Sequence, residues 1–425
     1  MSNQRLKREV GAGGAVLLGL GSMVGAGVFV SVGVAIDIAG PSACLAVALA
    51  ALLALCNGLS SAQLAAAHPV SGGTYEYGYR QLNSWWGFSA GWLFLCAKSA
   101  SAATAAIGFA QYAFPGSPTL LPAAATVVVL TAVTLTGLRR SNRVNAVLVS
   151  IVAAGLIGFA AVGLYRSGGG AFSLTPFFQS PDGGAVTLTG FLEAAALMFV
   201  AYTGYGRVAT LGEEIRDPRR SIPRAVIAVM AITMALYALV TIVVAGYGGS
   251  RGAEGGLLST IARGFGSPAL ATALTGAAAV ALLGVLLNLI LGLSRVMLAM
   301  GRRGDIPSVF ARVEKSGATP GPAVVASGLL IAALTLIGSV EAAWSFSAFT
   351  VLGYYSVTSL SALRLPPEKR LYPRFISYAG LAGCAFLAFW VKPIYLLIGS
   401  GVIGAGLIWK AVANLFNEPT EADES

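Results

Sequence analysis

Apolar residues form long runs along this chain, and most charged residues lie in the short stretches between them. A helix that crosses a bilayer needs about 20 consecutive apolar residues, and the runs divide into about twelve segments of that length. The segments begin near residues 11, 41, 87, 119, 144, 187, 223, 267, 321, 341, 374 and 393. The pattern therefore predicts an all-α membrane protein with about 12 transmembrane helices.

Glycines interrupt two of these segments near their midpoints. The first segment is broken at 20–29, Leu-Gly-Ser-Met-Val-Gly-Ala-Gly-Val-Phe, and the sixth at 199–206, Phe-Val-Ala-Tyr-Thr-Gly-Tyr-Gly. Unpaired backbone groups are costly in lipid, so such breaks are expected only where they line a cavity or face protein. Two broken segments at corresponding places in two halves of a chain indicate the substrate site of a transporter.

The positions of the two breaks also predict an internal repeat. If the first broken segment opens a five-helix unit, the sixth opens another, and an odd number of helices makes the two units enter the membrane from opposite sides. We therefore expect a 5+5 inverted repeat with discontinuous helices 1 and 6. The expected organisation is a cytoplasmic N-terminus (1–10), repeat 1 (TM1–5, 11–165), repeat 2 (TM6–10, 187–363), TM11–12 (374–411) and a cytoplasmic tail (412–425).

The amino-acid composition also indicates that the protein is surrounded by lipid. Hydrophobic residues make up 56% of the chain and charged residues only 10%, whereas about 25% is usual for soluble domains. The four cysteines lie in apolar segments without metal or redox spacing, which is typical of small buried residues. His68 is the only histidine, which excludes a multi-histidine metal site. We expect neither a metal nor a cofactor.

The distribution of basic residues predicts the orientation of the chain. Of the 27 Lys and Arg residues, 20 fall on the side of the N-terminus and four on the other side. Because cytoplasmic loops carry the excess of Lys and Arg, both termini are expected in the cytoplasm. This bias accounts for the net charge of +10 without nucleic acid. The outer connections at 166–186 and 247–266 are rich in Gly, Ser and Pro and are expected to be loops.

The two breaks present complementary backbone groups. The outer half of the first segment, from about Ala26, points its N-terminal amides at the membrane centre, where they favour a carboxylate. The half of the sixth segment that ends near Val200 points carbonyls at the same depth, and these suit an ammonium group. Together they match the head group of an amino acid. The alternative is close helix packing, because Gly21 and Gly25 have small-xxx-small spacing.

Lys98 lies near the middle of the third segment. A charge there costs about 2.5–3.5 kcal/mol, so the side chain should face protein or water. Ser101 and Thr104 follow at helical spacing and form a polar stripe beside it, from which we take Ser101 as a substrate contact. We hypothesise that Lys98 titrates during transport or pairs with an acidic substrate. The alternative is a structural lysine that snorkels or caps carbonyls.

Four runs of the chain, at 21–29, 69–75, 202–224 and 295–307, resemble motifs of the amino acid–polyamine–organocation (APC) superfamily, in order and at its spacing. The run Gly-Glu-Glu at 212–214 is most similar to the bacterial and cationic-amino-acid-transporter-like branch. The resemblance covers nearly the whole chain. It implies a LeuT-like fold, alternating access, and a permease of the plasma (inner) membrane of a bacterium that works by symport or antiport.

The resemblance also implies site residues, carried over position by position. Substrate contacts would come from Met23, Val24, Gly25, Ala26 and Gly27 in the first break and from Phe199, Ala201, Tyr202 and Gly204 in the second. The gate candidates are Arg207, Glu213, Glu214 and Trp344, with Phe199 and Tyr202 as aromatic gates.

Three positions depart from the pattern of relatives. Ala26 stands where many have Ser or Thr, and Val152 stands where some proton-coupled relatives have a lysine. Gly206 lies near the position where arginine exchangers carry an acid. Because no acid lies at the centre of a segment, a cationic side chain would have no buried counter-charge.

We therefore expect a secondary active transporter for a neutral amino acid, with proton-coupled uptake or exchange. The alternative is a cationic amino acid or polyamine antiporter or exporter of the same fold. An enzyme is not expected, since one histidine and no central acids supply no catalytic constellation. The expected partners are the amino acid, protons and membrane lipid, with no nucleic acid, and the oligomeric state stays open.

Overall fold

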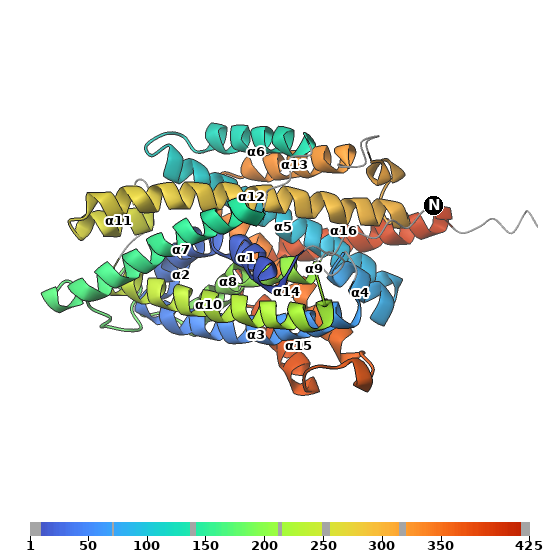
Figure 1. The fold of residues 1–425 in the computed structure, drawn as a ribbon, viewed down its shortest axis with the longest axis horizontal. Coiled ribbons are helices and arrows are strands. Elements are labelled where there is room, and N and C mark those ends of the chain that lie inside the picture. Colours follow the sequence, from blue (N-terminus) through green and yellow to red (C-terminus); the bar gives the residue numbers. More distant parts are fainter. Residues whose placement is uncertain are drawn as a thin grey trace, which may run out of the picture.

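Helices dominate the chain, and long ones such as α10 (Pro218–Tyr247) and α12 (Pro268–Arg303) run along its long axis (Figure 1). The computed structural model describes residues 10–69, 72–136, 142–210, 215–248, 256–313 and 320–417. β-type pairing within these ranges is limited to two isolated bridges, Val10 with Ile215 and Gln179 with Ala185. The predicted all-α class is therefore confirmed. Glu213 and Glu214, the segment 1–9 and the tail from 418 lie outside the described residues.

Twelve helical passes correspond to the twelve predicted segments in the described part of the chain. The first is α1 (Ala12–Met23), η1 (Gly27–Ser31) and α2 (Val32–Ala39), and the sixth is α8 (Leu188–Ala201), η4 (Thr203–Tyr205) and α9 (Gly206–Thr210). The others are α3 (Ala43–Ala67), α5 (Ser84–Ala113), α6 (Leu120–Leu135), α7 (Asn142–Tyr165), α10 (Pro218–Tyr247), α12 (Pro268–Arg303), α13 (Gly321–Thr335), α14 (Val340–Leu363), α15 (Arg374–Ala388) and α16 (Pro393–Asn417).

Seven stretches of the described chain are long and apolar enough to cross a membrane. The first of them, Ala12–Ala67, contains the first two passes, joined by η2 (Gly40–Ser42). The helices α6, α13 and α15 are apolar but shorter. α14 belongs neither to the long apolar stretches nor to the shorter apolar helices, because its many Ser and Thr side chains lower its mean hydropathy. Most of these side chains are buried against neighbouring helices.

Short helices lie at the two ends of the molecule. α4 (Thr74–Gln81) lies at one end and α11 (Leu257–Gly264) at the other (Figure 1). The prediction of a loop throughout 247–266 is wrong, because Leu257–Gly264 is helical. Leu257, Leu258, Ile261 and Ala262 are all buried. Their i, i+1, i+4, i+5 spacing gives this short helix one apolar face that packs on the bundle. The remaining turns are η3 (Arg166–Gly169), η5 (Ser308–Ala311) and η6 (Pro367–Lys369).

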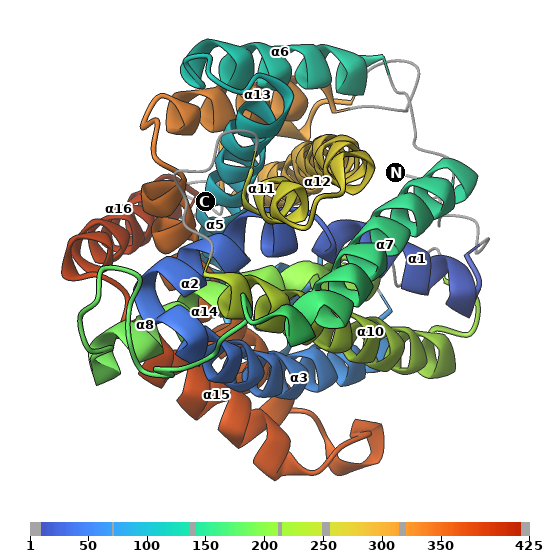
Figure 2. The ribbon, with the colours of Figure 1, turned by 90° about the vertical axis from the view of Figure 1, so that its left-hand side faces the viewer.

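The broken helices lie inside the bundle, and the periphery is apolar. α6 packs on α13 at one edge, and α15 packs on α3 and α14 at the opposite edge (Figure 2). Peripheral side chains such as Leu121, Leu329 and Leu397 are exposed, as expected for helices that face lipid. Inside, α5 buries a row of alanines, which lets its neighbours approach closely.

Of the four free cysteines, Cys384 is buried, but the other three are only partly buried.

Candidate functional site

The first break lies at Val24 and Gly25. α1 ends at Met23, and the Gly25 amide turns back to the Met23 carbonyl at 2.9 Å. The amides of Val28 and Phe29 both donate to the Gly25 carbonyl, at 3.1 and 3.0 Å, and one π-helical turn follows. A Cβ on Gly25 would lie 2.5 Å from Val285 Cγ2 on α12. Glycine is therefore needed here for the break to pack against α12.

The second break follows α8. The Tyr202 amide donates to the Phe199 carbonyl at 3.1 Å, and the chain makes one 3₁₀ turn before α9 begins at Gly206. The Tyr355 hydroxyl, from α14, donates to the Thr203 carbonyl at 3.0 Å. A carbonyl freed by the break is thus satisfied by a neighbouring helix, as buried backbone requires.

The two breaks lie directly against each other. A Cβ on Gly204 would lie 2.5 Å from Met23 Cγ and 2.7 Å from the Ser22 carbonyl carbon. A Cβ on Gly27 would lie 3.0 Å from Ala201 Cβ. Sequence spacing alone suggested that the breaks belong together, and the fold brings them into contact.

Tyr237 of α10 bridges the two breaks. Its hydroxyl lies 2.6 Å from the Met23 carbonyl, to which it donates, and 3.4 Å from the Ala201 carbonyl. Its ring packs against that of Tyr202, with centroids 5.1 Å apart. Sequence reasoning missed Tyr237, because a single tyrosine in an apolar segment carries no distinguishing signal.

The predicted substrate residues of the two breaks lie at or beside this contact, and all but Gly204 are buried. Tyr202 and Phe199 have no exposed surface. The Tyr202 hydroxyl is buried without a hydrogen-bond partner in the described chain. A buried polar group of this kind is costly and favours a ligand contact. The other buried members of the set are Met23, Val24, Gly25, Ala26, Gly27 and Ala201, and Gly204 is partly exposed.

Lys98 contacts the second break from α5. Its ammonium donates to the Thr203 hydroxyl at 3.0 Å, and that hydroxyl donates to the Val200 carbonyl at 2.8 Å. Among the described residues no carboxylate forms an ion pair with Lys98. Ser101, one turn further along, is bonded instead to Ser347 of α14 at 2.7 Å. Thr104 donates to the Ala100 carbonyl of its own helix.

The gate candidates occupy different places. Trp344 is buried and donates through Nε1 to the Leu197 carbonyl at 3.0 Å. This bond connects α14 to α8 on the N-terminal side of the second break. Arg207 lies in α9, on the C-terminal side of the second break, and is partly buried. Glu213 and Glu214, the other two gate candidates, lie outside the described residues.

A small cavity lies beside the first break, between α1, α7 and α12. Val152, the position at which some relatives have a lysine, lines it, and the wall is mostly apolar. Asn145 supplies polar atoms there and donates to the Leu17 carbonyl at 2.8 Å. The remaining lining residues are Gly21, Val24, Leu148, Val149, Val280, Ala281 and Gly284.

Solved structures show the fold class. The crystal structure of MhsT in complex with L-phenylalanine superposes with a TM-score of 0.61 at 16% identity. The match covers 94% of this chain and 100% of that one. The chain therefore has the LeuT-like fold that the resemblance to the APC superfamily implied.

Sequence comparisons show the family. The chain is 40% identical to an uncharacterized transporter of Mycobacterium tuberculosis, over 99% of this chain and 94% of that protein. It is 26% identical to the branched-chain amino acid permease BcaP of Bacillus subtilis (95% and 91% covered) and to a vacuolar cationic amino acid transporter of Arabidopsis thaliana (84% and 60% covered). The amino acid permease family model matches residues 14–413. This chain belongs to the amino acid permease family of the APC superfamily.

Proposed function

We propose that this chain is a secondary active transporter that carries a neutral amino acid across a bacterial inner membrane by alternating access. The contact between the two breaks, with Tyr237 bonded to both, carries this proposal. Discontinuous helices that meet in the interior supply backbone groups for a zwitterionic head group. The Tyr202 hydroxyl, which has no hydrogen-bond partner among the described residues, lies in the same place and adds a polar contact for that group.

The charge at the second break favours a substrate with a neutral side chain. Lys98, a basic residue, bonds to the second break through the Thr203 hydroxyl. Ion pairs in the described chain join Glu76 with Arg80 and Arg303, Glu341 with Lys392, and Asp305 with Lys410, and none of these pairs brings a carboxylate to Lys98. A cationic substrate would meet the Lys98 ammonium without a compensating carboxylate, so its burial would be costly.

Relatives support both substrate classes, since one is named for branched-chain and another for cationic amino acids. A cationic amino acid or polyamine antiporter therefore stays the second candidate. The presence of Lys98 favours the neutral class. Lys98 is also our candidate for coupling to protons, because its bond to Thr203 links an ionisable group to the break.

A ligand screen on the purified protein tests the substrate class. Each of the twenty amino acids and several polyamines is added, and the thermal unfolding midpoint is measured. A ligand present at about 100 times its Kd stabilises the folded state by about 2.7 kcal/mol. We expect stabilisation by neutral amino acids. Stabilisation by arginine, lysine or polyamines alone would favour the second candidate, and no response to any amino acid would contradict amino acid transport.

Proton coupling is tested at Lys98 with two variants. Lys98→Ala removes the amine, whereas Thr203→Val removes its hydrogen-bond partner and leaves the amine in place. In liposomes, proton uptake driven by the amino acid that the screen identifies should be lost in Lys98→Ala and retained in Thr203→Val. Unchanged coupling in Lys98→Ala would show that Lys98 is structural.

A further inference from the structure

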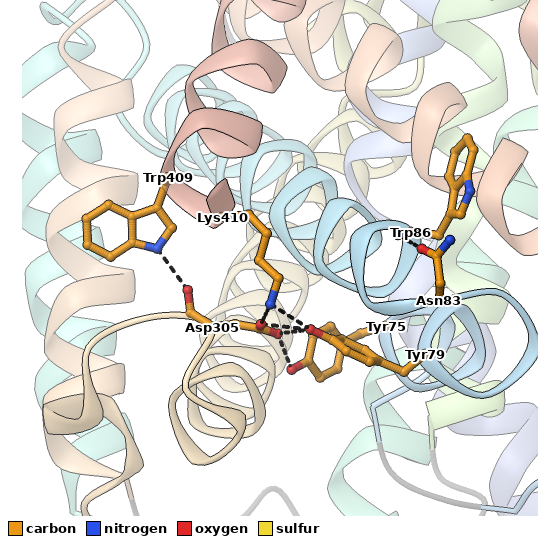
Figure 3. Close-up of polar contacts among 7 residues, drawn as sticks. All are labelled: Tyr75, Tyr79, Asn83, Trp86, Asp305, Trp409 and Lys410. Carbon is orange, nitrogen blue, oxygen red and sulfur yellow. Dashed lines mark hydrogen bonds and ion pairs between the residues drawn. The ribbon is translucent and has the colours of Figure 1, made fainter. Parts of the chain in front are cut away.

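Asp305 is the centre of a buried polar cluster that lies outside the two breaks. It follows the C-terminal end of α12 and is only 1% exposed. The hydroxyls of Tyr75 and Tyr79 donate to its carboxylate, each at 2.7 Å, and so does the ammonium of Lys410, also at 2.7 Å (Figure 3). The cluster therefore joins α4, the end of α12 and α16.

The backbone of Asp305 is held as firmly as its side chain. Trp409 donates through Nε1 to the Asp305 carbonyl at 2.8 Å (Figure 3). The Asp305 amide donates to the Met300 carbonyl at 2.9 Å. Gly304 precedes it with a φ of 79°, a left-handed conformation that glycine adopts without strain. α16 thus supplies two neighbouring residues, Trp409 and Lys410, to the same aspartate.

The protonation of the two tyrosines suits this arrangement. Burial, followed by the hydrogen bond to Asp305, raises the pKa of Tyr75 and of Tyr79 well above the ordinary value. Both hydroxyls therefore remain donors across the physiological range. Arg303 lies 4.0 Å from the Tyr79 ring centroid and pairs with Glu76 of α4 at 2.6 Å. α4 is thus held on one side by the charges around Asp305.

On its other side, α4 contacts the inner half of the second broken helix. The Tyr77 hydroxyl donates to the Ala209 carbonyl of α9 at 3.3 Å. Thr74 shares a hydrogen bond of 2.7 Å with Thr358 of α14. α4 has only eight residues, and so short a helix is not stable by itself. Its position depends on these neighbours.

We propose that Asp305 and Lys410 are positioning residues for transport: they fix α4, and through Tyr77 they hold α9, the moving inner half of the second broken helix. The final helix then has a role in the transport cycle, in addition to facing lipid. The structural part of this inference does not depend on the substrate. Its consequence for transport rests on the proposed function, in which α9 moves during alternating access.

Hydrogen–deuterium exchange of the full-length purified protein tests the inference without a substrate. Asp305→Asn and Lys410→Met each remove one charge from a buried pair, which leaves the other uncompensated. Amide exchange in α4 and α9 should become at least about tenfold faster, while α6 and α13 stay unchanged. Lys410→Arg keeps the charge and should exchange like the natural protein.

Two further variants make the result specific. Lys392→Met removes an ion pair with Glu341 at the opposite end of α16 and should leave α4 and α9 unchanged. Tyr77→Phe should speed exchange in α9 more than in α4, because it removes the bond between them while the contacts of α4 with Asp305 and Thr358 remain. An unchanged α9 in Asp305→Asn and Lys410→Met, equal acceleration in all helices, or an equal effect of Lys392→Met and Lys410→Met would overturn the proposal. Because no amino acid is added, these outcomes are independent of the ligand screen.

Discussion

A single hydroxyl group connects the two broken helices. Tyr237 lies on α10, has no exposed surface, and reaches the carbonyls of Met23 and Ala201. Both carbonyls belong to the residue at which a helix ends. In the interior of a membrane protein such groups need a partner, and one side chain serves both.

Replacing Tyr237 by Phe should therefore weaken the site. Loss of the hydroxyl removes a buried hydrogen bond to the Met23 carbonyl and the contact with the Ala201 carbonyl, at a cost of about 1–3 kcal/mol. We expect a lower thermal unfolding midpoint and a weaker response to the amino acid identified in the ligand screen. Tyr247→Phe is the matched control, since Tyr247 lies on the same helix and donates to one carbonyl, that of Gly163, at 2.9 Å. Equal loss of ligand response in both variants would show that Tyr237 has no special role.

Glycine residues allow the two broken helices to contact each other closely. Gly204 faces Met23 Cγ and the Ser22 backbone at distances that no Cβ would tolerate. The glycine run at 20–29 identified the first break from sequence, but Gly204 shows what the glycines of the second break do. They allow the backbone of one broken helix to lie on the other, so the packing and the substrate-site interpretations both hold for the same residues.

Gly204→Ala should separate the breaks. Since the clash involves backbone atoms of Ser22, we expect loss of transport and of the thermal shift caused by the amino acid. Gly276→Ala in α12 is the control, because nothing lies within 4 Å of a Cβ there, and a helical Gly→Ala change is neutral or favourable by up to about 1 kcal/mol. Retention of full transport in Gly204→Ala would contradict the close contact of the breaks.

Across the whole molecule, the ion pairs of the last helix lie at the two ends of the bundle. Lys392, just before α16, pairs with Glu341, and hydrogen bonding to Glu341 raises the pKa of Lys392. Lys410, near the other end of the same helix, pairs with Asp305. The last helix is therefore tied to the bundle at both ends by ion pairs, while its apolar side chains between them face outward.

The positive-inside asymmetry predicts which end faces the cytoplasm. Asp182 and Ser308 are both exposed. A cysteine introduced at one or the other of these positions should differ in its labelling by a membrane-impermeant thiol reagent. In intact cells Asp182→Cys should react and Ser308→Cys should react only after permeabilisation. The parent chain, with its four natural cysteines, is the control. The reverse pattern would place both termini outside.

Local residue patterns were enough to predict the helices and the breaks. Each predicted segment begins within about five residues of a helix start, because length and hydropathy are local properties. The helix at Leu257–Gly264 was missed, since Gly and Ser on either side indicated a loop. Tyr237 and Asp305 were missed as well, because each acts on partners far away in the sequence.

The sequence by itself determined that this chain is a helical membrane protein with two interrupted helices and a set of motifs typical of amino acid permeases. These follow from the composition and spacing of nearby residues, which limit how each segment can satisfy its backbone in lipid. Only the tertiary structure decided which groups meet. Lys98 reaches Thr203, Tyr237 bonds to both breaks, and Lys410 reaches Asp305. Such contacts depend on how helices from distant parts of the chain pack, and no local pattern encodes them.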